Sequence, residues 1–241
     1  FNLYSSRYNF SQYASYSSAS TGASLTLGFP LTDYSRLLLI YSLHSDNINV
    51  NSSLCQPGFQ TVSAVLCEQR GSNLTSQISF QYRYDDRDDP IKPTRGFYVD
   101  FNQSFAGFGG NVDFAQTIID GAVYHAFSPS YVLMIKGEVG DIEPWNKDYV
   151  RINDRFFRGG DSFRGFQLAG IGARDVVYGD ALGGNFYAQG TAELTVPNYL
   201  PEQYGINTAI FAQVGTGGAL DRPAKINPMT GLQDPDINDA L

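Results

Sequence analysis

Residues 77–84 have the sequence QISFQYRY, in which polar side chains alternate without a break with apolar or aromatic ones. In an extended chain, successive side chains point to opposite faces. One face therefore carries Ile78, Phe80, Tyr82 and Tyr84. The other face carries Gln77, Ser79, Gln81 and Arg83. This period of two predicts a β-strand that separates an apolar environment from a polar one.

The same alternation returns along most of the chain, whereas no helical periodicity persists beyond ten residues. We predict about nine strands, near 1–13, 19–30, 34–49, 74–87, 95–107, 111–127, 130–141, 183–197 and 204–217. The composition agrees, because 16 Tyr, 17 Phe and 25 Gly suit many strands joined by tight turns. An all-β fold of this length is compatible with one large domain or with two small ones.

Composition also limits where such a sheet can lie. The chain has 241 residues and no run of about 18 apolar residues, so a transmembrane helix is excluded. A membrane β-strand needs only about ten alternating residues. The apolar faces fit either lipid or the interior of a soluble β-sandwich, and polar faces rich in Gln, Asn, Thr and Tyr favour the lumen of a barrel. The net charge of −8 argues against nucleic acid as a partner.

The connections between the predicted strands alternate in length. Short links rich in Pro and Asp fall at 30–33, 88–94, 127–129 and 197–203. The other set consists of the cysteine segment 50–73, a tight link at 107–110 and the long stretch 142–182. A membrane barrel shows this pattern when tight turns lie on one side and larger loops on the other. A soluble sandwich can alternate in the same way.

The segment 155–175, RFFRGGDSFRGFQLAGIGARD, is unusual for a loop because it holds four arginines, two aspartates and five glycines. Phe163, Arg164, Gly165 and Phe166 resemble the Val/Phe-Arg-Gly-Phe/Tyr signature of the BamA family, the outer-membrane assembly factors that fold and insert other β-barrels. The same family loop is matched by Gly159, Gly160 and Asp161. Further segments that resemble the family, in the expected order, are 25–30, 183–185 and 193–197.

The resemblance implies an all-β, antiparallel transmembrane β-barrel in the outer membrane of a Gram-negative bacterium. Barrels of this family have sixteen strands preceded by periplasmic POTRA repeats, so residues 1–241 correspond to a partial barrel domain of about nine strands, the fifth to the thirteenth. We expect the repeats and the terminal strands to be absent, and loop 142–182 to fold inward. A sheet with two unpaired edges is expected to be unstable or to aggregate outside the complete protein.

The resemblance also assigns partners to Arg164. A guanidinium inside a confined lumen needs anionic or aromatic neighbours, because an unpaired charge there is costly. In the family this arginine docks on the inner wall, and the matching positions are Glu193, Phe211 and Gln213. Gln213 departs from the family, which commonly has Asp there, so docking leans more on Glu193 or on Asp161. Without the resemblance, Arg164 fits an ordinary surface ion pair.

Cys55 and Cys67 lie twelve positions apart in one polar segment. They are compatible with two unpaired thiols or, as we favour, with a disulfide formed in an oxidising compartment. Neither a CxxC motif nor a nearby histidine supports a metal site. His44 and His125 have no nucleophile or carboxylate constellation around them, so we predict no enzyme activity and no cofactor. The acid-rich stretch 85–89 is interpreted as a solvated periplasmic turn.

By resemblance, the parent protein is the core component of the outer-membrane β-barrel assembly machinery and acts without covalent chemistry. Its expected partners are outer-membrane lipids, unfolded outer-membrane proteins and accessory assembly lipoproteins. The alternatives are a two-partner secretion or TamA-like transporter of the same superfamily, a passive porin, and a secreted enzyme or lectin-like sandwich.

Overall fold

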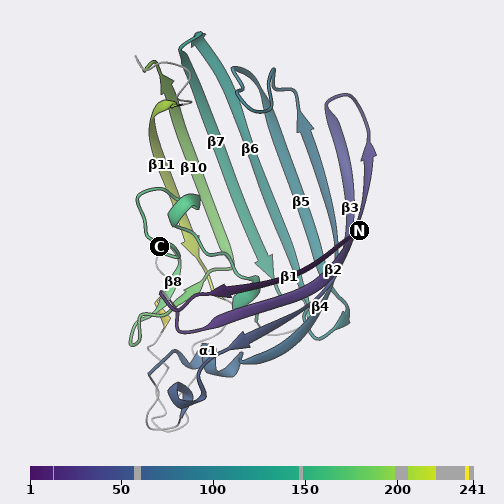
Figure 1. Ribbon diagram of the computed structural model, residues 1–241, viewed down its shortest axis with the longest axis vertical. Coiled ribbons are helices and arrows are strands. Elements are labelled where there is room, and N and C mark those ends of the chain that lie inside the picture. Colours follow the sequence, from purple (N-terminus) through teal and green to yellow (C-terminus); the bar gives the residue numbers. More distant parts are fainter. Residues whose placement is uncertain (13, 57–60, 147–148, 199–205, 221–236, 239–241) are drawn as a thin grey trace.

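The computed structural model describes the chain except for residue 13 and the ranges 57–60, 147–148, 199–205, 221–236 and 239–241. Its main feature is a nine-stranded antiparallel sheet with the order β1-β2-β3-β4-β5-β6-β7-β10-β11 (Figure 1). The strands are β1 (Asn2–Asn9), β2 (Ser17–Pro30), β3 (Ser35–Asn49), β4 (Gly71–Asp85), β5 (Arg95–Gly110), β6 (Phe114–Ser128), β7 (Tyr131–Glu143), β10 (Phe186–Val196) and β11 (Thr208–Gly218). The prediction of an all-β antiparallel fold is confirmed.

One face of this sheet is apolar and uncovered. Apolar side chains lie directly opposite one another on it, as where Leu25 faces Tyr41 and Tyr41 faces Ile78. On β11, Ile210 and Val214 are 67% and 75% exposed. Apolar surface is unfavourable in water by about 25 cal/mol per Å², and a membrane strand turns such a face to lipid. We therefore assign this face to the hydrocarbon of a membrane.

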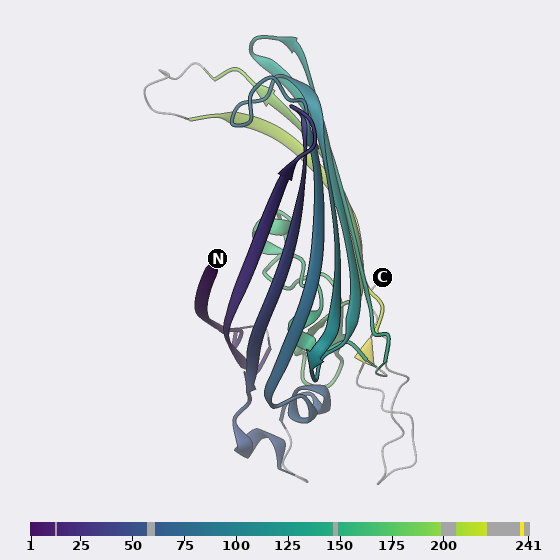
Figure 2. The ribbon, with the colours of Figure 1, turned by 90° about the vertical axis from the view of Figure 1, so that its right-hand side faces the viewer.

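The opposite face is concave (Figure 2), and its side chains are polar. Ser104 Oγ donates to Ser79 Oγ at 2.8 Å, and Thr117 Oγ1 donates to the side-chain carbonyl of Gln103 at 2.6 Å. Arg83 forms an ion pair with Asp100 on the neighbouring strand. These contacts satisfy polar groups across the strands, as the inner wall of a water-filled barrel requires.

The segment between β7 and β10 lies on the concave side of the sheet (Figure 2). It contains the 3₁₀ helices η2 (Ile152–Asp154) and η3 (Gly160–Ser162) and the short strands β8 (Ala173–Asp175) and β9 (Ala181–Gly183). β12 (Ile237–Asn238), from the C-terminal region, pairs with β8 to complete a three-stranded sheet. Asn153 Nδ2 donates to Ser18 Oγ of β2 at 2.9 Å. Arg164 N donates to Gln213 Oε1 of β11 at 2.8 Å. The segment therefore connects strands that lie near opposite edges of the sheet.

A hydrophobic cluster closes one end of the sheet. The connection from β3 to β4 contains η1 (Ser52–Cys55) and α1 (Ala64–Glu68), and it packs there against the segment between β7 and β10. Leu66, Ile152 and Leu182 are fully buried in this cluster. A disulfide joins Cys55 to Cys67, whose Cα atoms are 5.7 Å apart. We call this end the cap. Among the described residues, no helix is both long and apolar enough to cross a membrane.

Several strand ends differ from the sequence prediction. A tight link was expected at 107–110, but β5 continues to Gly110, and the turn to β6 falls at 111–113. Gly107, Gly109 and Gly110 all have positive φ, so these glycines bend the strand without ending it. At the other end of the sheet, β1 stops at Asn9 instead of continuing toward residue 13. The predicted strand at 204–217 begins at Thr208, and its first two positions lie outside the described residues.

Replacing both Cys55 and Cys67 by serine should loosen the cap without unfolding the sheet. A disulfide closing a loop of this length contributes about 3 kcal/mol by restricting the unfolded segment. We expect proteinase K to cleave the connection between β3 and β4 faster in intact outer membranes, with unchanged heat-modifiable migration of the barrel on gels. Dithiothreitol treatment of the unmodified protein should reproduce the effect. Equal cleavage rates with and without the disulfide would contradict this prediction.

Candidate functional site

Residues 163–166 form the FRGF motif, and the loop that carries them is closed on itself by short hydrogen bonds. Gly160 N donates to Phe166 O at 2.9 Å, and Ser162 Oγ accepts from Gly159 N at 3.0 Å. Gly159 has a φ of 130°, and a Cβ there would lie 2.1 Å from Gln167 O. Only glycine fits such a position. The glycines thus produce a tight turn that presents Arg164 to the wall.

Arg164 makes three contacts with the inner wall. Its Nη2 donates to Glu193 Oε2 at 2.5 Å, and its Cζ lies 3.8 Å from the centre of the Phe211 ring. Its backbone N–H donates to Gln213 Oε1 at 2.8 Å, while Gln213 Nε2 donates to Thr191 Oγ1 at 2.9 Å. The guanidinium therefore has both an anionic and an aromatic neighbour, which offset the loss of water.

Strand pairing explains why these wall residues lie together. Glu193 of β10 is directly opposite Phe211 of β11, and Thr191 is opposite Gln213. Residues two apart on a strand share a face. The sheet register thus places the carboxylate, the ring and the amide on one patch of the inner wall, whereas Asp161 of the loop is exposed and Arg164 pairs with Glu193 instead.

Phe163 fixes the position of the motif beside this patch. Its side chain is 6% exposed and lies over Gly215 of β11, where an added Cβ would come within 2.8 Å of the ring. Phe166 packs edge-on against Phe163 at 5.2 Å between ring centres. Gln189 Nε2 donates to Ser162 O at 2.8 Å. A glycine in the wall therefore creates the recess that receives the first aromatic residue of the motif.

A second arginine of the loop, Arg158, also contacts the wall. Its Nη1 lies 3.5 Å from Glu138 Oε2 of β7, and its Cζ lies 3.4 Å from the centre of the Tyr187 ring on β10. The family resemblance assigned no partner to this arginine. The inward parity of Glu138 and Tyr187 was readable, but only the folded loop shows which arginine meets them.

Three further charged residues of the loop hold its own backbone. Arg155 is buried and donates to the carbonyl oxygens of Val150 and Leu182 at 3.1 and 3.2 Å. Arg174 donates to Ala169 O at 2.6 Å, and Asp175 accepts from Val177 N at 3.0 Å. These side chains shape the loop rather than bind the wall.

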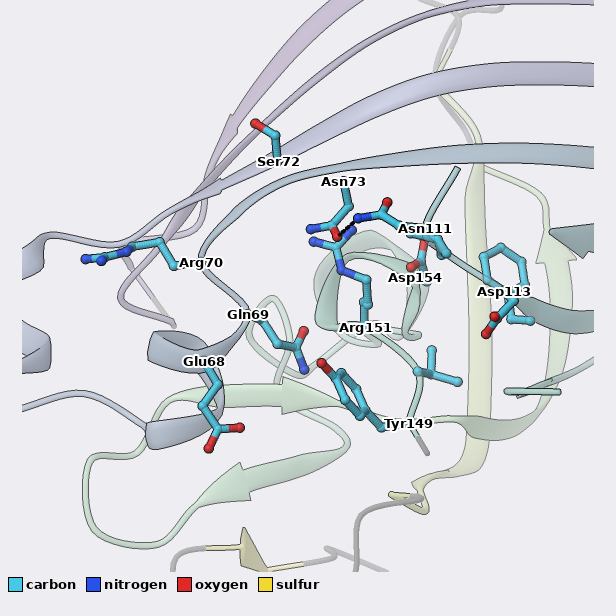
Figure 3. A pocket seen from close by; sticks show the side chains of 13 residues that line it. Glu68, Gln69, Arg70, Ser72, Asn73, Asn111, Asp113, Tyr149, Arg151 and Asp154 are labelled. Carbon is cyan, nitrogen blue, oxygen red and sulfur yellow. Dashed lines mark hydrogen bonds between the residues drawn. The ribbon is translucent and has the colours of Figure 1, made fainter. Parts of the chain in front are cut away.

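A polar cavity of about 210 Å³ lies where the loop meets the cap (Figure 3). Arg151 extends into it near Asn73 and Asp154, and Ile152 N donates to Gln69 Oε1 at 2.7 Å. Burial raises the pKa of Asp154 to about 6, although the positive charge of Arg151 opposes the shift. Burial also lowers the pKa of Arg151. Within the described part of the chain, Asp154 Oδ2 has no hydrogen-bond partner.

His44 has one carboxylate neighbour, and the acid-rich turn is closed by hydrogen bonds of its own. His44 Nε2 lies 3.2 Å from Asp46 Oδ2, and His125 packs edge-on against Phe127. In the turn between β4 and β5, Asp88 accepts from Thr94 and from the backbone N–H of Arg95, and these hydrogen bonds lower its pKa. Among the described residues, no group of three or more His, Cys, Asp or Glu side chains is arranged to hold a metal ion.

Comparisons with known proteins identify a family and several relatives. Residues 1–228 match the family model described as the Omp85 superfamily domain. The outer membrane protein assembly factor BamA of Neorickettsia risticii (strain Illinois) is 35% identical over 208 residues, which cover 86% of this chain and 27% of that protein. The sorting and assembly machinery component 50 homolog of Homo sapiens is 31% identical over 140 residues, covering 57% of this chain and 29% of that protein.

Among solved structures, BamA from Haemophilus ducreyi lacking POTRA domains 1-3 superimposes with a TM-score of 0.71 at 19% sequence identity. The match covers 85% of this chain and 42% of that one. The chain thus spans about a quarter of the length of the Neorickettsia relative, and the resemblance to BamA inferred from the FRGF loop is confirmed. The chain belongs to the Omp85 superfamily.

Proposed function

We propose that the whole protein is the core component of an outer-membrane β-barrel assembly machinery, which folds and inserts outer-membrane proteins without covalent chemistry or a cofactor. The superfamily and the barrel-type sheet place the chain in the outer membrane as an integral protein. The assembly role is supported by the relatives named as assembly factors. The observation that carries the proposal is the inward loop, whose motif arginine contacts Glu193, Phe211 and Gln213 together.

In this proposal, residues 1–241 are a partial barrel domain that corresponds to strands five to thirteen of a sixteen-stranded barrel. The wall provides a rigid inner surface, and loop 142–182 is held against it by Arg164. A loop docked in this way reduces the freedom of the inner wall and leaves the lipid-facing surface intact. Lipids would contact the apolar face, while unfolded outer-membrane proteins and accessory lipoproteins would act on the complete protein.

Replacing Arg164 by alanine in the full-length protein should lower the rate of barrel assembly about five- to tenfold, because the variant loses one charge-assisted hydrogen bond and one cation–π contact in a partly exposed site. Lysine at this position keeps the charge without the planar fork and should give an intermediate rate. The assay is folding of an outer-membrane client in proteoliposomes. Arg36→Ala, which removes an exposed arginine on β3, is the matched control. Parental assembly by Arg164→Ala would exclude the proposed role of the dock.

Changing Gln213 to aspartate should strengthen the dock. The carboxylate would still accept from Arg164 N–H, and it would place a second negative charge beside the guanidinium. We expect slower hydrogen exchange of the loop amides than in the parent protein. Gln213→Leu, which removes the acceptor, is the opposing control and should speed exchange. Faster exchange in the aspartate variant would show that its repulsion from Glu193 outweighs the gain.

Lowering the pH from 7 to 5 should tighten the loop against the cap. The folded state raises the pKa of Asp154 to about 6, so it binds that proton more strongly than the unfolded segment does. The stability of the docked loop therefore falls as pH rises from 5 to 7, by about 1 kcal/mol. Hydrogen exchange of residues 149–156, corrected for the intrinsic pH dependence of amide exchange, measures the effect.

Asp154→Asn is the control, because an amide removes the titration. His44, Asp46 and Arg151 face the same carboxyl group, so a pH effect that persists in this variant belongs to them. Equal pH dependence in the parent and the variant would contradict the assignment to Asp154.

A further inference from the structure

The inner wall contains a row of three carboxylates. Asp100 of β5 lies directly opposite Asp120 of β6, and Asp120 lies directly opposite Glu138 of β7. Like charges at directly opposed positions destabilise a sheet. Asp100 is 5% exposed and the Glu138 side chain 16%, so the repulsion is larger than on an open surface. We call these residues the acidic row; it requires cations close by.

The wall itself supplies two of the three cations. Arg83 of β4 pairs with Asp100 at one end of the row. Lys136 of β7 pairs with Glu138 at the other end. Three carboxylates against two cations leave one negative charge in the row. The third cation comes from the loop, because Arg158 Nη1 lies 3.5 Å from the second oxygen of Glu138.

The wall is also shaped to receive the flat face of this guanidinium. Tyr187 is 3% exposed and lies across Gly140 of the neighbouring strand, where an added Cβ would come within 2.1 Å of the ring. Phe156 packs edge-on against the same ring at 4.7 Å. Arg158 Cζ then stacks at 3.4 Å from the ring centre. A guanidinium stacked on an enclosed tyrosine and paired with a carboxylate is a strong dock.

Arg158 is the more shielded of the two docking arginines. Its side chain is 19% exposed, compared with 39% for Arg164. Its backbone is paired as well, because Ile171 N donates to Arg158 O at 3.1 Å. The two docks use different strand pairs, β7 with β10 for Arg158 and β10 with β11 for Arg164. Each dock can therefore open without removing the contacts of the other.

We propose that Arg158 is a second positioning residue. It anchors the base of the loop, where Ile171 N donates to Arg158 O, to the acidic row of the inner wall, and it does so independently of Arg164. This inference rests on the proposed function only in assuming that the docked loop matters for assembly. Arg158 holds the base of the loop in the lumen, and the more exposed Arg164 dock releases and re-forms at the tip. The acidic row selects a cation at position 158, and Tyr187 selects a planar one.

The test is hydrogen exchange of the amides of residues 158–171 in the full-length protein in detergent or nanodiscs. Arg158→Gln should raise their exchange rate about tenfold, as expected for the loss of one enclosed cation–π contact and one ion pair. Arg158→Lys keeps the charge without the flat face and should fall between the two. Tyr187→Leu should match Arg158→Gln, whereas Tyr187→Phe keeps the ring and should behave as the parent. Arg36→Gln is the control for removal of an arginine elsewhere.

A charge swap separates docking from general packing. Arg158→Glu adds a fourth carboxylate to the row and should loosen the loop more than Arg158→Gln does. Combining it with Glu138→Arg recreates the pair with opposite polarity and should return exchange at least halfway to the parental rate. Unchanged exchange in Arg158→Gln, or a double variant as loose as Arg158→Glu alone, would overturn the proposal. If Arg158→Glu does not fold, the glutamine, lysine and Tyr187 variants still decide it.

The exchange measurement does not require assembly activity, so the two proposals fail separately. A loop loosened in Arg158→Gln together with normal assembly by Arg164→Ala would retain the second anchor and remove the proposed role of docking. Normal exchange in Arg158→Gln together with poor assembly by Arg164→Ala would retain that role and remove the second anchor.

Discussion

Charge neutralisation inside a two-faced sheet is the constraint on which this structure depends. One face is apolar and suited to lipid, so charged groups of the inward loop that lose contact with water need partners on the other face or within the loop. Arg164 meets this requirement with Glu193 and Phe211, which strand pairing brings side by side. The loop can enter the lumen because the wall already carries the anions and rings that its guanidinium groups need.

Small residues in the wall decide where those contacts form. Gly215 leaves the recess for Phe163, and Gly140 leaves the space across which Tyr187 lies. A side chain at either position would displace an aromatic ring that contacts or supports an arginine. The position of the loop therefore depends on two glycines of the wall, on β7 and β11, as much as on the sequence of the loop itself.

The alternation of side chains was sufficient to predict most of the sheet, because a lipid face and a water face impose a period of two on every strand. That same parity, with the family resemblance, placed Glu193, Phe211 and Gln213 on the inner face. The alternation could not show which inward carboxylate pairs with Arg158, because Asp100, Asp120 and Glu138 all point to the same face. The cap was missed because α1 has only five residues and its burial depends on contacts distant in sequence.

The loop also connects parts of the sheet that never pair with each other. Asn153 contacts Ser18 on β2, and Arg164 contacts β11, with the remaining strands of the wall between them. The loop is fixed at both places and spans the concave side between them. A change in the curvature of the sheet must therefore lengthen or break a contact at one end of the loop. The contact at Arg164 is partly exposed, whereas Ile152 beside Asn153 is fully buried in the cap. Opening of the wall should therefore be felt first at the motif arginine, which links the conformation of the loop tip to the shape of the barrel.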